Sequence, residues 1–267
     1  MDGSDDGCRV LQAREGGPAE RFADRLGAAH PAAVFAAALV CGYLALVAAS
    51  LLLALFVTDV LLDVGGLGSF DESAIVSIVA DRTPFLTDAS SVGSAVGGAP
   101  VLPILVGIIA IVCAFLRRWR IAAFAVFVLV VESATYRVTS LVVPRDRPHV
   151  QRLEDLPADA SYPSGHTAAS IAVYAGLVLL LTSAIPNRRL RIAAWVAAIV
   201  LALFVAFSRM YRGMHHPLDV AGGALVGIGA VLVLLFACRA ADAAARSRVR
   251  GRGRDRVARP GRMRATA

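Results

Sequence analysis

The sequence predicts an all-α, polytopic membrane protein that folds as a bundle of six transmembrane helices, with its active site at the outer membrane face. The chain has 267 residues, of which 57% are hydrophobic, and its mean hydropathy is +0.67. That hydrophobicity lies well above the range of ordinary soluble domains. Six apolar runs predict the spans. Five of them can cross about 30 Å of hydrocarbon as a helix, and the run over residues 192–207 is short but adequate if its ends are buried.

The six runs divide the chain into three parts. We expect residues 1–31 to form a polar, poorly ordered cytoplasmic arm, residues 32–238 the six-span domain, and residues 239–267 a disordered Arg-rich tail. Acidic and apolar pieces alternate over residues 58–93, which predicts an outer loop with one or two short interfacial helices. The predicted spans are residues 32–57, 94–116, 121–143, 166–185, 192–207 and 217–238.

The distribution of arginine sets the expected orientation. The connections at 117–120 and 188–191 hold three Arg each, and the tail holds ten. Positive charge in short loops favours the cytoplasmic side, so both termini are expected there and the remaining connections outside. The charge of the tail fits contact with anionic lipid headgroups or a simple positive-inside anchor. Nucleic-acid binding is not expected, because the tail lacks interleaved aromatic residues.

The most informative stretch is Ser161–Thr167, where a polar loop meets the fourth apolar run. Pro163 and Gly165 mark a turn, and Ser164 is a good N-cap for the helix that follows. The unpaired N–H groups of a helix start attract an anion such as phosphate, and His166 beside them can exchange a proton near neutral pH. Taken alone, a capped helix with a surface histidine explains these residues equally well.

Two further stretches, 144–149 and 208–219, lie at similar boundaries and on the same expected face. Both contain Arg, the side chain best suited to hold phosphate oxygens with paired N–H groups. His215 lies four residues before Asp219, and a carboxylate one helical turn away can orient an imidazole. His216 lies three residues before Asp219, and its spacing is equally suitable.

Together the three stretches resemble the motifs of the type 2 phosphatidic acid phosphatase superfamily, the membrane lipid-phosphate phosphatases. The second motif, Pro-Ser-Gly-His, is complete at Pro163–His166. The third motif is Ser-Arg, five residues, His, three residues and Asp, and it is complete at Ser208–Asp219. The first motif is a Lys, six residues and Arg-Pro; here Arg147 and Pro148 match, but Ser140 stands at the Lys position. The resemblance covers the chain from the third span to the sixth.

The resemblance implies a role for each matched residue. His215 attacks phosphorus and forms a transient phosphohistidine, Asp219 orients that imidazole, and His166 protonates the leaving group and then activates water. His216 is left with packing or headgroup contact. Because Arg neutralises the phosphoryl charge, neither a metal ion nor another cofactor is expected. The groups implied to hold the phosphoryl oxygens are Arg147, Arg209, Ser164 and the backbone N–H of Gly165.

The missing Lys leaves the first motif one cation short. Ser140 can hydrogen-bond a phosphate oxygen but brings no charge, so a substitute cation is expected. Arg137, one helical turn earlier, is the first choice, and Arg145 in the loop is the second. Glu132 is a further ionisable group within a span, which indicates function or a hydrogen bond, to Tyr136 or to another span, that holds helices together.

The resemblance implies hydrolysis of phosphate monoester or pyrophosphate bonds of lipids at the outer leaflet. Candidate substrates are phosphatidic acid, phosphatidylglycerol phosphate and polyprenyl diphosphates, and the sequence chooses neither among them nor an oligomeric state. Two alternatives are a catalytically retired member that binds lipid and a transporter. Polar residues gather at the outer loops rather than along the spans, which argues against a transporter. Retention of both histidines and of Asp219 argues against a retired member.

Overall fold

The computed structural model describes residues 8–257 apart from residues 28 and 159. Every named element in this part of the chain is helical, which confirms the all-α prediction. Single turns occur at η1 (Arg9–Leu11), η2 (Leu61–Asp63) and η3 (Ile171–Ala175), the last of them a π-helical turn. The longer helices are α1 (Pro18–Arg25), α2 (Pro31–Asp59), α3 (Leu67–Ala80), α4 (Pro84–Val96), α5 (Val101–Phe115), α6 (Trp119–Val142), α7 (Gly165–Ser170), α8 (Gly176–Thr182), α9 (Arg188–Tyr211) and α10 (Pro217–Val257).

Five helical segments in the described part are long and apolar enough to cross a membrane, and a bent pair makes up to six. The bent pair is α4 and α5, whose axes differ by 41°. The sequence predicts one continuous span over residues 94–116, but the structure breaks it between Val96 and Val101. Gly97, Gly98 and Pro100 account for the break, because Gly and Pro are the least favourable residues in a helix interior.

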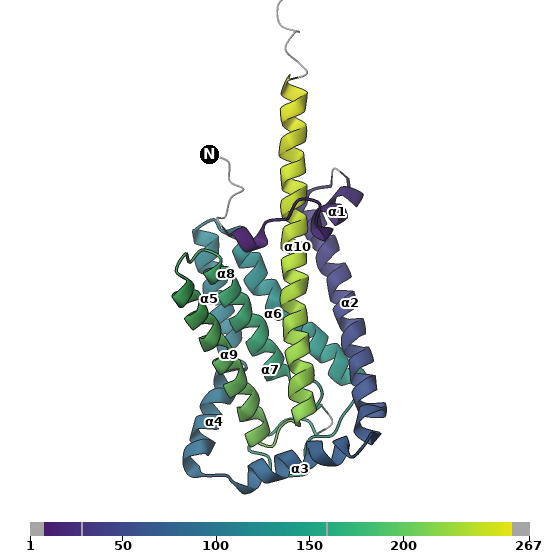
Figure 1. The fold of residues 1–267 in the computed structure, drawn as a ribbon, viewed down its shortest axis with the longest axis vertical. Helices are drawn as coiled ribbons and strands as arrows, with labels where there is room; N and C mark the ends of the chain where they lie inside the picture. Colours follow the sequence, from purple (N-terminus) through teal and green to yellow (C-terminus); the bar gives the residue numbers. More distant parts are fainter. Residues whose placement is uncertain (1–7, 28, 159, 258–267) are drawn as a thin grey trace, which may run out of the picture.

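Helix α10 is central to the bundle (Figure 1) and approaches the fourth span, Gly165–Thr182, at backbone level. Glycine makes this approach possible. A Cβ at Gly223 would lie 2.4 Å from the carbonyl oxygen of Ser164, and one at Gly227 would lie 2.5 Å from that of Ala168. Small residues permit such close contact between membrane helices, and here the contact fixes the start of α7 against the start of α10.

The amino-terminal arm differs from its prediction. Residues 8–26 pack on α10 instead of forming a poorly ordered arm, and Leu11 is fully buried. The backbone N–H of Ala13 donates to Asp242 at 2.8 Å, and Asp242 also pairs with Arg120 at 3.1 Å. Alanine-rich surfaces on α1 and α10 allow this packing, which a polar composition does not reveal.

The expectation of disorder from residue 239 is wrong for residues 239–257, because α10 continues as a helix to Val257. The reason is that α10 makes ion pairs beyond the end of its apolar run. Asp242 pairs with Arg246 at 3.2 Å on the same helix, and Arg250 lies 3.5 Å from Glu15. The remaining ends of the predicted arm and tail, residues 1–7 and 258–267, lie outside the described residues.

The predicted short helices of residues 58–93 are present as α3 and the greater part of α4. Helix α3 crosses beneath one end of the bundle, and α1 lies at the other end (Figure 1). The loop over residues 143–164 and the first residues of α10 lie at the α3 end, where α3 side chains hold them. All three motif stretches therefore meet at one end of the bundle.

Candidate active site

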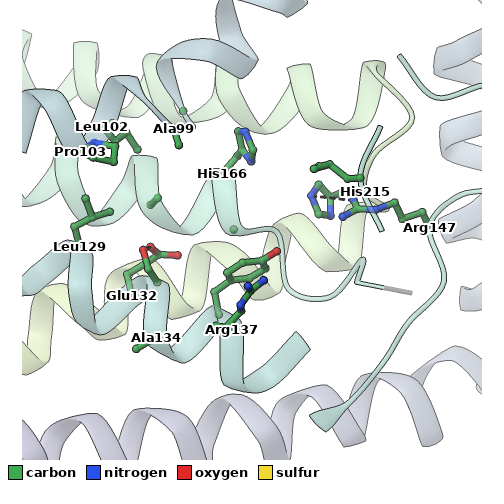
Figure 2. A pocket seen from close by; sticks show the side chains of 17 residues that line it. Ala99, Leu102, Pro103, Leu129, Glu132, Ala134, Arg137, Arg147, His166 and His215 are labelled. Carbon is green, nitrogen blue, oxygen red and sulfur yellow. Dashed lines mark hydrogen bonds between the residues drawn. The ribbon is translucent and has the colours of Figure 1, made fainter. Parts of the chain in front are cut away.

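A cavity of about 580 Å³ lies between the α4–α5 break, α6 and the start of α7. Three histidine and arginine side chains of the motif stretches contribute to its wall: Arg147, His166 and His215. Figure 2 shows these three together on one side of the cavity and Leu129 and Glu132 on the other. The cavity thus has a cationic and imidazole-lined end and a largely apolar end.

His215 is 2% exposed, and its ring orientation is fixed by the loop before α7. Its Nδ1 lies 2.7 Å from the carbonyl oxygen of Ser161. A carbonyl oxygen can only accept a hydrogen bond, so Nδ1 carries the proton and Nε2 is the unprotonated nitrogen. Burial, and next the charge of Arg209, lower the pKa of His215 well below its ordinary value. A neutral imidazole with a free Nε2 at a cavity wall is a nucleophile.

Asp219 does not orient His215 by the direct contact that the i, i+4 spacing predicts. The nearest pair of atoms, His215 Nδ1 and Asp219 Oδ2, is 3.9 Å apart, beyond hydrogen-bonding distance. The physical reason is that α10 begins at Pro217, so His215 lies outside the helix. Asp219 acts through Ser161 instead: Asp219 Oδ2 accepts from the Ser161 hydroxyl at 2.6 Å, and the Ser161 carbonyl accepts from His215.

His216 has a different environment from the packing or headgroup contact expected of it. Its Nδ1 lies 3.2 Å from Asp219 Oδ2, and its Nε2 lies 2.9 Å from Oε2 of Glu72 on α3. Burial alone would lower the pKa of His216, but the hydrogen bond to Asp219 and its charge raise that pKa above its ordinary value. His216 therefore joins α3 to the first turn of α10.

Arg145, the second-choice substitute cation, is not directed at the cavity. It pairs with Asp219 and with Asp71 of α3, the latter at 2.5 Å. Asp71 is 1% exposed and also accepts from the backbone N–H of Leu218 at 3.0 Å. Sequence reasoning missed Asp71, because an acid in an alternating acidic and apolar segment indicates a solvated interfacial face.

Arg147 and Arg209 are both buried, and their partners differ. Arg147 donates to the carbonyl oxygens of Pro157, Met214 and Ala160 at 2.8, 2.5 and 2.9 Å, and its Nη1 faces His215 Nε2 at 3.5 Å. Three carbonyl partners hold its guanidinium rigidly beside the predicted nucleophile, His215. The structure therefore places one permanent cation at the predicted nucleophile.

Arg209 is fully buried and only partly satisfied. Its Nη1 donates to Ser94 Oγ at 2.5 Å and to Glu154 at 2.7 Å. Its Nε and Nη2 have no hydrogen-bond partner among the described residues. Unpaired donors on a buried cation are costly, and an anion such as a phosphoryl group would satisfy both.

Glu154 is a site residue that sequence reasoning missed. It accepts from Arg209, from Arg212 at 2.6 Å and from Ser94 at 2.8 Å. Burial alone would raise its pKa, but the charge of Arg209 and these hydrogen bonds bring the pKa of Glu154 to about 2. An acid of the same sign as phosphate carries no sequence signal for this role; only the fold shows that it positions Arg209.

The remaining predicted phosphate-binding residues divide into two groups. Gly165 and Arg137 line the cavity, and Arg137 is exposed there. Ser140 and Ser164 are buried and do not belong to the cavity wall. The Ser140 hydroxyl donates to the carbonyl of Arg137 at 3.2 Å, and Ser164 Oγ lies 3.0 Å from Thr167 Oγ1 rather than capping the helix backbone.

His166 lies against the break between α4 and α5. A Cβ at Gly98 would approach within 2.4 Å of His166 Nε2, so only glycine fits beside the ring. His166, His215 and Arg147 therefore line one end of the cavity, whereas Arg209 and His216 do not belong to its wall. Within the described residues, no group of three or more His, Cys, Asp or Glu is placed to hold a metal ion.

Comparison with known proteins finds one matching family and several relatives. Residues 121–241 match the model of the PAP2 superfamily. An undecaprenyl-diphosphatase of Sulfolobus acidocaldarius is 36% identical over 44% of this chain and 55% of its own length, so the match spans about half of that relative. A phosphatidylglycerophosphatase B of Bacillus subtilis is 27% identical over 65% of this chain and 84% of its own length.

A solved structure has the same fold. It is the crystal structure of a transmembrane PAP2 type phosphatidylglycerolphosphate phosphatase from Bacillus subtilis, with a TM-score of 0.60 and 24% identity. The superposition covers 83% of this chain and 98% of that chain. At this identity the likeness shows the fold alone.

The contact between Glu72 and His216 predicts a pH-dependent contribution to stability. Burial would raise the pKa of Glu72, but the hydrogen bonds from His216 and from the backbone of His149, together with the charges of both histidines, lower that pKa. The pKa of His216 is raised. The pair is therefore charged above the ordinary pKa of Glu and is lost as pH rises through the folded-state pKa of His216. Glu72→Gln should lower the thermal unfolding midpoint in detergent by a few degrees at pH 6, an effect of about 1 kcal/mol or less, and by less at pH 9.

Glu72 also lies 3.7 Å from the exposed His149, so the comparison is made in a His149→Ala background. Asp81→Asn, an exposed change just after α3, is the matched control. An equal loss of stability at pH 6 and pH 9 would contradict the role assigned to His216.

Proposed function

Because residues 121–241 belong to the PAP2 superfamily, we propose that this protein is an integral membrane phosphatase. It hydrolyses phosphate monoester or pyrophosphate bonds of lipid phosphates through a phosphohistidine intermediate. The observation that carries this proposal is the neutral His215, whose unprotonated Nε2 faces Arg147 at the cavity wall. Within the described residues, two N–H groups of the buried Arg209 have no partner, which suits the binding of a phosphoryl group.

The proposed reaction has two displacements. His215 Nε2 attacks phosphorus, the bond from phosphorus to the leaving oxygen breaks, and His166 gives that oxygen a proton. His166 then takes a proton from water, the water oxygen attacks phosphorus, and the N–P bond breaks. Arg147 and Arg209 neutralise the charge that spreads over the equatorial oxygens, which is the main requirement of phosphoryl transfer.

Asp219 and Glu154 have positioning roles in this proposal. Asp219 holds Ser161, which fixes the tautomer and the ring orientation of His215. Glu154 holds Arg209 by an ion pair of 2.7 Å. Both act through another residue, so both keep the nucleophile and the cation in place before substrate arrives.

A lipid is supported as the substrate class by the apolar end of the cavity and by the relatives. Leu102, Pro103 and Leu129 line the end away from His215 (Figure 2). A cavity of about 580 Å³ suits a headgroup and the first part of a chain. The curated relatives act on undecaprenyl diphosphate and on phosphatidylglycerophosphate by name.

The active site is proposed to face away from the cytoplasm. The Arg-rich connections before α6 and α9, together with α1, gather at the end of the bundle opposite α3 and the site (Figure 1). Positive charge favours the cytoplasmic side, so the substrate pool is the outer leaflet. The basic end of α10 is then available to anionic lipid headgroups on the inner face.

His215→Ala should abolish release of phosphate from lipid phosphates, and Asp219→Asn should lower it strongly, since the residues act as a unit. His166→Ala should impair poor leaving groups most and an activated aryl phosphate least, because the latter needs no proton. Activity should survive EDTA. A phosphate-release assay on purified protein in detergent measures the activity of the three variants and the effect of EDTA. Abolition by EDTA, or near-normal activity of His215→Ala, would show that the mechanism is wrong.

Arg137→Ala should raise KM and lower kcat/KM by about tenfold, because an exposed arginine contributes less than a buried phosphate contact. Arg137→Lys should keep most of the activity if charge alone is needed. Arg189→Ala, an exposed arginine at the start of α9, is the control and should have no effect. Full activity of a folded Arg137→Ala protein would show that Arg147 and Arg209 suffice.

Orientation is tested by single cysteines introduced into a background without native Cys. A membrane-impermeant maleimide added outside intact cells should label Asp155→Cys in the active-site loop and leave Arg250→Cys unlabelled until the membrane is opened. Both positions are exposed in the structure, so burial does not decide the result. The reverse pattern would place the substrate pool on the cytoplasmic side.

A further inference from the structure

A second polar group lies inside the same cavity, at its apolar end. Glu132 of α6 is 1% exposed and lines the wall together with Ser133. Its Oε2 accepts a hydrogen bond from Ser133 Oγ at 3.0 Å. Its Oε1 has no partner anywhere in the described part of the chain. Figure 2 shows the carboxyl group turned into the cavity, between Leu129 and Arg137.

The contacts of Glu132 argue against a purely structural role. Its one hydrogen bond within the described residues stays inside α6, and neither Tyr136 nor another span provides one. It therefore does not hold helices together. A buried carboxyl oxygen without a partner is destabilising, and a buried ionised carboxylate is more so. Such a group in a cavity wall indicates a ligand that satisfies it.

The position of Glu132 shows which part of the substrate it meets. The transferred phosphoryl group belongs between His215 and Arg147, and the leaving oxygen belongs at His166, the proton donor. The leaving lipid then extends towards Leu102 and Leu129, where the wall is apolar. Glu132 lies on that route, so its ligand is part of the leaving group and not the phosphoryl group itself.

The chemistry of a carboxyl group limits which chemical group of the leaving lipid can meet Glu132. An ionised carboxylate repels an anionic phosphate and cannot donate to an ester carbonyl. A hydroxyl group can donate to a carboxylate and can both donate to and accept from a neutral carboxyl. A hydroxyl is therefore the group that fits Glu132 Oε1 in either charge state. Ser133 supports it by holding Oε2 in place.

We propose that Glu132, positioned by Ser133, binds a hydroxyl group of the leaving lipid alcohol close to the scissile bond. The protein then selects glycerol-type lipid phosphates that carry such a hydroxyl over polyprenyl or alkyl phosphates that lack it. This specificity rests on the phosphatase function proposed above and names the substrate class of the same site.

The test compares three substrates for the purified protein. Lysophosphatidic acid carries a hydroxyl next to the phosphate-bearing carbon, an alkyl phosphate of equal length lacks it, and farnesyl diphosphate represents the polyprenyl class. Wild type should show kcat/KM at least about tenfold higher for lysophosphatidic acid than for the other two, since a site built to bind a hydroxyl rejects analogues without it. Glu132→Leu should remove this preference and leave hydrolysis of the alkyl phosphate within about twofold.

Matched variants separate binding from a general effect on α6. Glu132→Gln keeps hydrogen-bonding atoms and should keep part of the preference, and Ser133→Ala should weaken it. Thr135→Val is the control. Thr135 is equally buried on α6 and is absent from the cavity wall, and within the described residues its hydroxyl donates only to the carbonyl of Val131. It should leave the substrate ratio unchanged.

Three results would overturn the inference. Equal kcat/KM of wild type for all three substrates would do so while leaving the phosphatase function intact. Equal loss of activity by Glu132→Leu on all three would assign Glu132 to packing. If Glu132→Leu does not fold, the ratio of kcat/KM between lysophosphatidic acid and the other substrates, measured for wild type and for Glu132→Gln, still tests the inference. Failure of wild type to release phosphate from any of the three would refute the phosphatase proposal itself, and the inference would fall with it.

Discussion

The site depends on the buried carboxylate of Asp219 and the three segments that it joins. Asp219 accepts from Arg145 and Ser161 of the loop before α7 and from His216 before α10, and Arg145 in turn pairs with Asp71 of α3. Taking such a charge out of water is costly unless it is paired and hydrogen-bonded. The loop, α3 and the start of α10 must therefore close on it together. His215 gains its tautomer from this closure through the Ser161 carbonyl.

The spans and many of the candidate site residues could be predicted from the sequence, because their signals are local. Apolar runs long enough to cross a bilayer indicate spans, and the motif stretches at their ends indicate His166, His215, Arg147 and Arg209. The predictions that failed, and the site residues that were missed, depend on tertiary contacts. The i, i+4 spacing of His215 and Asp219 has its expected meaning only inside a helix, and α10 begins between them. Asp71 and Glu154 have acidic side chains whose partners lie far away in the chain, so composition alone could not place them.

The apolar packing of the bundle and the polar site constrain each other. Glycines on α10 bring its backbone against Ser164 and Ala168, and Gly98 lets the α4–α5 break reach the ring of His166. A methyl group would displace the backbone at the start of α7 in the first place and the ring of His166 in the second. Close packing of the bundle therefore holds the start of α7 and the His166 ring in position.

The place of α10 in the chain has a consequence for biosynthesis. The residues that complete the site, His215 to Asp219, lie immediately before and within the first turn of the final described helix. A nascent chain that has inserted all its earlier spans still lacks the proposed nucleophile and the carboxylate that closes the loop. Under the proposed function, partly translated protein is therefore inactive, and activity begins only when α10 has joined the bundle.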